Sequence, residues 1–223
     1  MKRSEINRLI REAADFFAQH QFLLPPFASW QADHWREMGG RAAEIHRAGL
    51  GWDITDFGSG DFAAKGLTLF TVRNGTPNDP AGKTYCEKIM MVRENQVTPL
   101  HFHFAKMEDI INRGGGKLAI RFFWADPAGN LDRTRPVEIS TDGVTRSLTP
   151  GERLVLDPGQ SVTIPRMLYH DFWAVPGHGP VMAGEVSSVN DDKTDNRFLE
   201  APGRFPKIDE DEPPAFLLCG EYP

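Results

Sequence analysis

Three histidines and one glutamate have the residue types and the spacing of a metal site. His101 and His103 are separated by one residue, and Glu108 follows a few positions later. Side chains two positions apart on a strand point to the same face, so the two imidazoles can reach one cation. Glu108 can return from the next strand, and His170 can come from a distant hairpin that follows Pro165. Three neutral imidazoles and a carboxylate suit Mn, Fe, Co, Ni or Zn, with positions left open for a substrate.

Two charged residues near these ligands could act on a bound substrate. Lys106 lies between His103 and Glu108, where it is either a solvated hairpin charge or a cation directed at substrate oxygens, and we favour the second. Glu185 lies in a run of small and apolar residues and either faces solvent or enters the interior. Loss of hydration inside would raise its pKa toward the range useful to a base. Both residues are predicted to be catalytic.

A polar run at residues 189–198 follows this segment. It is dense in hydrogen-bonding groups and poor in apolar ones, which is typical of a solvated loop and also of a rim that binds a polyol. We expect Asp192, Asp195 and Arg197 to contact substrate hydroxyls.

Helical periodicity is confined to the first 50 residues. Apolar residues recur at the spacing of one helical face, at Ile6, Leu9, Ile10, Ala13, Phe16 and Phe17. The pattern predicts a helix with Ser4 as its N-cap that ends before Pro25. Two short helices are expected at 29–38 and 41–48, and the resulting layer, 1–50, should pack outside the rest of the chain.

Short β-type runs separated by Gly, Pro, Asn and Asp follow Gly51. The predicted strands are 52–57, 67–73, 85–93, 97–104, 108–112, 117–124, 136–140, 153–156, 161–164, 169–175 and 181–187. Many short, evenly spaced strands indicate a mainly β jelly-roll barrel over 51–223, in which the two histidine-bearing segments meet. We expect one domain over 1–223, a solvated acidic loop at 206–214 and a last buried strand at 215–220.

Composition excludes several classes of protein. The chain has 223 residues, of which 40% are hydrophobic and 25% charged, with a formal charge of −6. These are ordinary globular values, and the absence of a basic surplus argues against nucleic acid as a partner. Cys86 and Cys219 form no disulfide framework and are expected to be buried thiols. The sequence contains no apolar run long enough to cross a membrane, and we expect a cytoplasmic protein.

The histidine segments resemble the two motifs of the cupin superfamily. Matching positions are His101, His103, Glu108 and Gly115 in the first motif, and Gly159, Pro165 and His170 in the second. Departures fall at Asn95, Met167 and Ala174, which are turn positions and not ligands. The resemblance implies a cupin barrel with a helical N-terminal decoration.

A closer resemblance covers essentially the whole chain. The opening residues 1–7, the segment 24–28, the first metal motif with Lys106, and residues 184–198 are similar to the bacterial D-lyxose isomerase family. This resemblance implies an aldose–ketose isomerase, usually manganese-dependent, that acts on D-lyxose and D-xylulose, with D-mannose and D-fructose as a slower pair. It also implies metal ligation by His101, His103, Glu108 and His170. Proton transfer through an enediolate and a hydride shift both remain open.

Two other functions compete with this one. A site of three histidines and one glutamate also serves cupin dioxygenases, which use Fe or Ni to activate oxygen. Such enzymes tend to have a small apolar pocket, whereas Lys106, Glu185 and the polar run supply groups that suit a sugar. A sugar-binding cupin without catalysis is the second alternative. A homodimer is the expected assembly.

Overall fold

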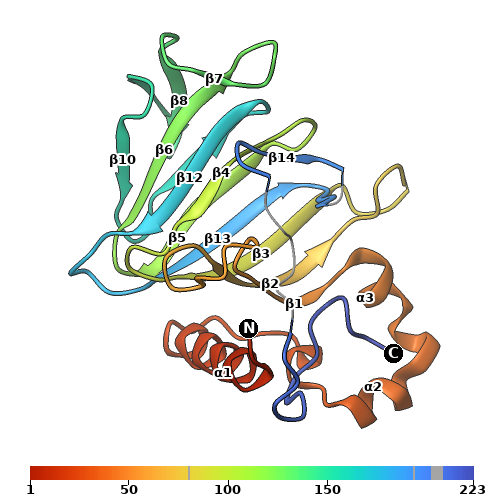
Figure 1. Cartoon of the computed structure of the whole chain (residues 1–223). Coiled ribbons are helices and arrows are strands. Elements are labelled where there is room, and N and C mark those ends of the chain that lie inside the picture. The colour runs from red at the N-terminus through yellow and green to blue at the C-terminus, as the bar shows by residue number, and fades with distance from the viewer. Residues whose placement is uncertain (80, 193, 202–207) are drawn as a thin grey trace.

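The strands pair into two antiparallel sheets that face each other, as predicted from the spacing of the β-type runs (Figure 1). The structure is a computed structural model and describes residues 1–79, 81–192, 194–201 and 208–223. The eight-stranded sheet contains, in spatial order, β1 (Gly51–Thr55), β2 (Leu67–Asn74), β3 (Tyr85–Val92), β13 (Val181–Ser188), β5 (Glu108–Gly115), β11 (Ser161–Ile164), β8 (Val137–Thr141) and β9 (Val144–Leu148). The six-stranded sheet contains β10 (Arg153–Leu156), β6 (Leu118–Ala125), β12 (Leu168–Ala174), β4 (Thr98–His103) and β14 (Asn196–Phe198), with β7 (Leu131–Asp132) beside β6. The mainly β, cupin-like fold is confirmed.

Alternation along the strands divides their side chains between two cores. On β1, Trp52 and Ile54 face outward while Asp53 and Thr55 face the space between the sheets, and all four are buried. The core between the sheets contains residues such as Met90, Ile110, Leu118, Ile120, Phe122, Val162 and Phe172. Because β1, β2 and β3 have both faces covered, these strands lack a clean polar–apolar alternation.

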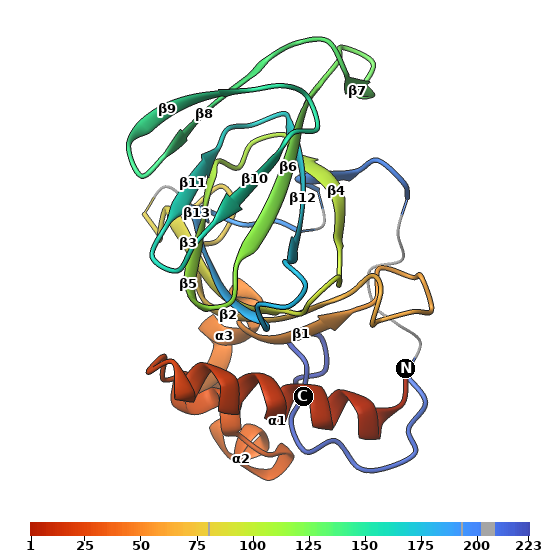
Figure 2. The same cartoon turned by 90° about the vertical axis from the view of Figure 1, so that its left-hand side faces the viewer.

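The helices cover the outer face of the eight-stranded sheet at its β1 edge (Figure 2). They are α1 (Arg3–Gln19), α2 (Ala32–Met38) and α3 (Ala43–Ala48), with 3₁₀ turns at Pro26–Ser29 and Gly39–Ala42. The predicted apolar face of α1 packs on this sheet, for example through Ile6, Ile10 and Phe17. Among the described residues, none of the helices has the length and apolarity to cross a membrane.

Four local predictions are wrong. The N-cap position of α1 is Lys2, with no side-chain cap, and the Ser4 hydroxyl donates instead to Asp211. The segment 215–220 forms no strand and makes a single parallel bridge, from Leu218 to Trp52. The described part of the acidic segment, residues 208–214, is bound to α1 and is not simply solvated. Cys219 is only half-buried.

The structure contains three strands that the sequence did not predict, and one of the two cysteine thiols is buried as predicted. β7, β9 and β14 were not predicted, because β7 and β14 are very short and β9 is polar and exposed over most of its length. Cys86 is buried as expected, and burial raises the pKa of its thiol to about 12.

Two departures from the cupin motifs occupy unusual backbone conformations. Asn95 and Met167 both adopt positive φ, 58° and 63°, at positions where the motif has glycine. Asn tolerates this region well, whereas Met does not. Backbone hydrogen bonds hold Met167 in place, since its N–H donates to His103 and its carbonyl accepts from Ala125. The turns therefore keep their shape without glycine.

Candidate metal centre

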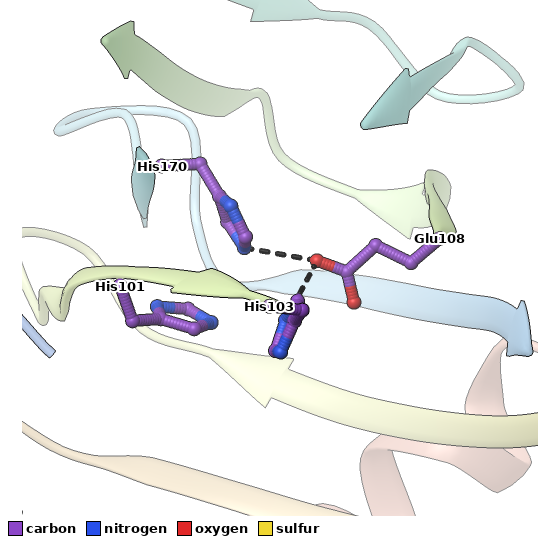
Figure 3. Close-up of side chains that lie close together, drawn as sticks. All are labelled: His101, His103, Glu108 and His170. Carbon is purple, nitrogen blue, oxygen red and sulfur yellow. Dashed lines mark ion pairs between the residues drawn. The ribbon is translucent and has the colours of Figure 1, made fainter. Parts of the chain in front are cut away.

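Four predicted ligands converge between the two sheets (Figure 3). β4 supplies His101 and His103, β12 supplies His170 directly opposite His101, and β5 supplies Glu108 from the facing sheet. One candidate ligand atom from each lies within 4.8 Å of the others, and all four residues are buried. Glu108 Oε1 lies 2.9 Å from His170 Nε2 and 3.2 Å from His103 Nε2.

Hydrogen bonds on the outer side of each ring fix its orientation. His101 Nδ1 lies 2.8 Å from the Pro99 carbonyl, and His170 Nδ1 lies 3.1 Å from the Leu168 carbonyl. A carbonyl only accepts, so each Nδ1 carries the proton and each Nε2 presents a lone pair to the centre. His103 Nδ1 contacts Asn196 Oδ1 at 2.8 Å in the same way. Partners of this kind are typical of histidines that bind a metal.

The chemistry of the donor set fits a cation. His103 Nε2 and Glu108 Oε1 are buried and have no hydrogen-bond partner among the described residues. Lone pairs that converge on a carboxylate oxygen repel one another unless a positive charge lies between them. The four ligands are therefore suited to a divalent metal ion, as the sequence predicted.

The ionisation states suit the same purpose. Burial, together with the neighbouring imidazoles of His170 and His103, holds the pKa of His101 well below its usual range. Burial opposes ionisation of Glu108, but the Lys106 ammonium and the neighbouring His103 and His170 rings together outweigh it and keep the pKa of Glu108 well below its usual range. A neutral imidazole and an ionised carboxylate are the forms that bind metals.

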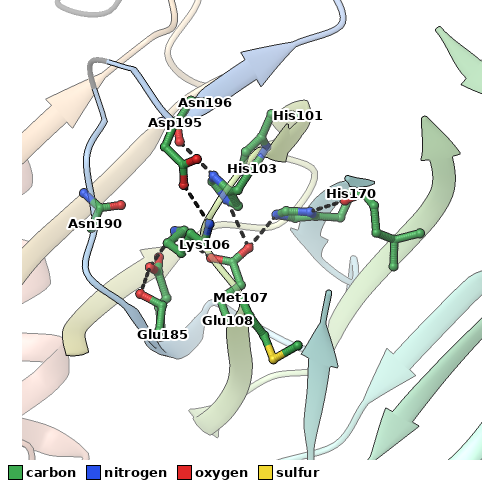
Figure 4. Close-up of polar contacts among 12 residues, drawn as sticks. His101, His103, Lys106, Met107, Glu108, His170, Glu185, Asn190, Asp195 and Asn196 are labelled. Atoms are coloured by element: carbon green, nitrogen blue, oxygen red, sulfur yellow. Dashed lines mark hydrogen bonds and ion pairs between the residues drawn. The ribbon is translucent and has the colours of Figure 1, made fainter. Parts of the chain in front are cut away.

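Lys106 connects the metal ligands to the second predicted catalytic residue (Figure 4). Its Nζ lies 2.8 Å from Glu108 Oε2 and 2.8 Å from Glu185 Oε1. Lys106 is 3% exposed, so the interpretation of a solvated hairpin charge is wrong. Glu185 enters the interior from β13 and is 5% exposed.

A second lysine, which the sequence analysis missed, holds the other side of Glu185. Lys88 lies opposite Glu185 in the β3–β13 pair, with Nζ 3.4 Å from Glu185 Oε2 and 2.9 Å from Asn190 Oδ1. It occupies an inward position two residues before Met90. The sequence could have indicated Lys88, because a lysine at an inward position of a largely apolar strand needs a charged partner inside the protein. The carboxylate of Glu185 is thus held between two ammonium groups.

Glu185 does not have the raised pKa that was expected from its burial. Burial does raise the pKa of Glu185, but the charges of Lys106 and Lys88 outweigh it, and the pKa lies below its usual value. Glu185 is therefore ionised at neutral pH. Loss of hydration alone does not set its basicity.

The three predicted rim residues lie in different surroundings. Asp192 lines the cavity, with Oδ1 3.8 Å from Lys88 Nζ. Asp195 lies against the loop between β4 and β5 that contains Lys106. Its carboxylate accepts hydrogen bonds from the backbone N–H groups of Ala105 and Lys106, at 2.6 and 2.9 Å. Arg197 borders the cavity, but its guanidinium reaches outward to the Ala128 carbonyl at 3.4 Å.

A cavity of about 590 Å³ opens in front of the metal ligands. Its polar wall includes Lys88, Lys106, Glu185, Asp192 and Asn196. Its apolar wall includes Phe57, Leu67, Leu69, Met90, Ile110, Phe172 and Phe198. Phe198, which was also not predicted, stacks on His101 with 5.2 Å between ring centroids. The cavity has the volume of a small-molecule site and presents both hydroxyl-binding and apolar surface.

Comparisons with known proteins agree with this geometry. The family model described as D-lyxose isomerase matches residues 1–222. A D-lyxose/D-mannose isomerase from Serratia proteamaculans is 48% identical over 224 residues, which cover 100% of this chain and 98% of that protein. A D-lyxose ketol-isomerase from Cohnella laeviribosi is 28% identical over 193 residues, covering 80% of this chain and 97% of that protein.

Solved structures show the same fold at lower identity. A mutant L-ribose isomerase from Acinetobacter sp. DL28, in complex with L-ribose, aligns with a TM-score of 0.65 and 15% identity, covering 94% of this chain and 98% of that one. The L-ribose isomerase of Geodermatophilus obscurus aligns with a TM-score of 0.60 and 16% identity, covering 91% and 94%. At these identities the likeness concerns the fold.

Proposed function

Because the chain belongs to the D-lyxose isomerase family and is an aldose–ketose isomerase, we propose that it interconverts D-lyxose and D-xylulose. D-Mannose and D-fructose are the expected slower pair. The name of the Serratia relative, D-lyxose/D-mannose isomerase, supports both aldoses.

The position of Lys106 carries this proposal. One ammonium group contacts both a metal ligand, Glu108, and a carboxylate outside the ligand set, Glu185, at 2.8 Å each. Isomerisation of a sugar needs a group that moves a proton next to a site that stabilises negative charge on oxygen. The contacts of Lys106 bring these two functions to the same end of the cavity.

Glu185 is the proposed proton carrier. Its carboxylate takes the proton from C2 of the open-chain aldose, and the C–H electrons form the enediolate. The hydroxyl proton of O2 passes to O1, and a proton that can exchange with solvent on the carboxylate is delivered to C1 to give the ketose. Its low pKa keeps it ionised and ready to accept a proton, and also makes it a weak base. The C2 proton must therefore be made more acidic by stabilisation of the oxyanion.

Lys106 is proposed to stabilise that oxyanion by donating a hydrogen bond. A divalent cation held by His101, His103, Glu108 and His170 would supply Lewis-acid stabilisation of the sugar oxygens. Asp192 is placed to bind a remote hydroxyl. Asp195 accepts hydrogen bonds from the backbone N–H groups of Ala105 and Lys106, and we propose that it contributes by holding Lys106 in position. Arg197 is proposed to contact substrate only where it borders the cavity.

Three features of the proposal are expectations from the sequence and its resemblances and not from this geometry. They are manganese as the bound metal, a homodimeric assembly and a cytoplasmic location. The ligand set is compatible with Mn(II) and also with Zn, Co, Fe or Ni.

The experiment is an assay of ketose formation from D-lyxose by metal-free protein supplied with Mn(II). We expect turnover with the wild type and a loss of about 10²-fold or more in kcat for Glu185→Gln, whose metal affinity should be retained. In deuterated water, label at C1 of the xylulose supports proton transfer, whereas its absence supports a hydride shift. Oxygen uptake with Fe(II) and no ketose would favour the dioxygenase instead.

A further inference from the structure

β4 contains an irregularity immediately before the ligand histidines. His101 pairs with His170, whereas Thr98 pairs with Phe172. The two pairs are three positions apart on β4 and only two positions apart on β12. This is a β-bulge, and it contains Pro99, which has no N–H to donate to the ladder. In a regular strand, residues three apart face opposite sides of the sheet. The bulge turns Thr98 to the cavity side together with His101.

The hydroxyl of Thr98 is a buried polar group that the described part of the chain leaves unpaired. Thr98 is 3% exposed, and its Oγ1 has no hydrogen-bond partner among the described residues. The residue lines the same cavity as the metal ligands. An unpaired buried hydroxyl is unfavourable in the free protein, and the cost is recovered when a ligand supplies a partner.

The location of this hydroxyl relative to the metal ligands suggests which part of a ligand it meets. On β12, the His101–His170 pair and the Thr98–Phe172 pair lie two positions apart, a rise of roughly 6–7 Å. A sugar whose first two oxygens lie at the ligands extends its remaining carbons along the cavity. Thr98 therefore lies level with the part of the chain that does not react.

The two walls of the cavity carry different groups. Lys88 and Glu185 lie on the eight-stranded sheet, whereas Thr98 lies on the facing six-stranded sheet. Its directly paired neighbour, Phe172, offers no polar side-chain atom. A hydroxyl at this place can recognise a ligand from the side opposite to the catalytic carboxylate.

We propose that Thr98 is a specificity-determining residue whose hydroxyl hydrogen-bonds a sugar hydroxyl beyond the two reacting carbons. This inference rests on the proposed function, and it names a further contact in the same site. The bulge has a second role, because its Pro99 carbonyl holds Nδ1 of His101. One backbone irregularity thus orients a metal ligand and exposes a substrate-binding group to the cavity.

The test compares Thr98→Val, which removes the hydroxyl at nearly constant shape, with Thr98→Ser, which keeps it. KM for D-lyxose is measured with Mn(II), and binding of D-arabinitol, the alditol of D-lyxose, is measured by calorimetry as a readout without turnover. For Thr98→Val we expect KM for D-lyxose to rise and the affinity for D-arabinitol to fall, each by about 3- to 10-fold, because a neutral hydrogen bond is lost. Thr98→Ser should stay within about twofold of the wild type. The thermal midpoint of ligand-free Thr98→Val should equal or exceed that of the wild type, because no satisfied contact is removed.

Deoxy analogues of lyxose identify the partner hydroxyl. The analogue that lacks it should bind wild type and Thr98→Val equally. Unchanged KM and alditol affinity in Thr98→Val would overturn the inference while leaving the isomerase function intact. Equal losses in Thr98→Ser and Thr98→Val would also overturn it, since Thr98→Ser keeps the hydroxyl and loss of the hydroxyl would then not explain the weaker binding. If wild-type protein shows no turnover of D-lyxose, the proposed function fails, and the alditol measurement still decides the role of Thr98.

Discussion

Glu185 shows how strongly a single side chain depends on its immediate partners. An isolated buried carboxylate has a raised pKa, but Lys106 and Lys88 lie on either side of Glu185 and reverse the shift. Lys88 in turn contacts Asn190, whose backbone is bonded to Asn74 at the end of β2. The orientation of the proposed base is therefore determined in part by residues, such as Asn190 and Asn74, that do not touch the metal ligands.

Replacing Lys88 by Met should separate these effects. The change removes one partner of Glu185, and we expect kcat to fall by about 10- to 100-fold through misplacement of the carboxylate. Removing a cation raises the pKa of Glu185, so the acidic limb of the pH–kcat profile should move to higher pH. Steady-state kinetics across pH measure both. Lys117→Met, at a lysine paired with exposed Asp157, is the control and should change neither. An unshifted acidic limb in Lys88→Met would contradict this role.

Asn196 should influence metal binding through His103. Its Oδ1 accepts from His103 Nδ1 at 2.8 Å, which keeps Nε2 free for the metal. Asn196→Leu removes this acceptor, and we expect Mn(II) affinity to fall by about 10- to 100-fold in a competition titration with a metal indicator. Asn196→Asp keeps an acceptor and should bind Mn(II) at least tenfold more tightly than Asn196→Leu does. Equal affinities in the two variants would argue against the assigned tautomer.

At the scale of elements, the C-terminal segment 208–223 fastens the helical layer. Arg3 at the start of α1 is 2% exposed and binds both Glu210 and Glu221. Tyr222 stacks on Trp35 of α2 and donates to the Leu50 carbonyl at 2.8 Å. This contact requires glycine at position 51, where a Cβ would overlap the tyrosine hydroxyl. Figure 1 shows both termini on this side of the molecule.

Arg3→Met should weaken this attachment and leave the chemistry unchanged. A buried arginine with two carboxylate partners is lost, but Glu210 is 57% exposed and can be resolvated, so we expect a decrease of about 1–3 kcal/mol in the free energy of unfolding. Chemical denaturation measures this decrease, and kcat should be unchanged. Arg8→Met, at an exposed position of the same helix, should cost no more than about 1 kcal/mol. A loss of activity in folded Arg3→Met would show coupling to the site that we do not expect.

The same contacts predict a pH dependence. The hydrogen bond from Arg3 lowers the pKa of Glu210, and the backbone N–H of Ser4 lowers the pKa of Asp211. Groups with a lowered pKa in the folded state stabilise it above their unfolded pKa, at roughly 4, and lose this contribution as the pH falls through the folded value. The stability difference between wild type and Arg3→Met should therefore shrink below about pH 4. Urea midpoints measured over pH 3–7 would show it, and a constant difference would contradict it.

At the scale of the whole molecule, the metal ligands couple the two sheets. His101, His103 and His170 lie on the six-stranded sheet, whereas Glu108 lies on the eight-stranded sheet. A cation that binds all four connects the two sheets and binds only the folded chain. The ligand cluster is therefore expected to contribute to stability as well as to chemistry.

Chelation should consequently lower both activity and thermal stability. At a free Mn(II) concentration of about 100 times Kd, binding adds about 2.7 kcal/mol, which corresponds to roughly 5–10 °C in Tm for a chain of this size. We expect EDTA to remove this increment and the ketose-forming activity, and Mn(II) to restore both. His170→Gln should lose most of the metal-dependent rise, while His178→Gln, at an exposed histidine, should retain it. Activity that survives complete metal removal would refute the proposed role of the site.

The sequence by itself determined the features that depend on local spacing. The interval between His101 and His103 fixes a shared face on a strand, and short β-type runs predict a two-sheet barrel, because both follow from the period of an extended chain. Residue types and order also proposed Glu108 and His170 as ligands, and the family resemblance implies the same set. Only the tertiary structure decided which distant groups meet. The partnership of Lys88 with Glu185, the contact of Asn196 with His103, and the bulge that turns Thr98 into the cavity depend on strand pairing between remote segments. Pairing of this kind is set by the packing of the whole barrel, and no local period in the sequence encodes it.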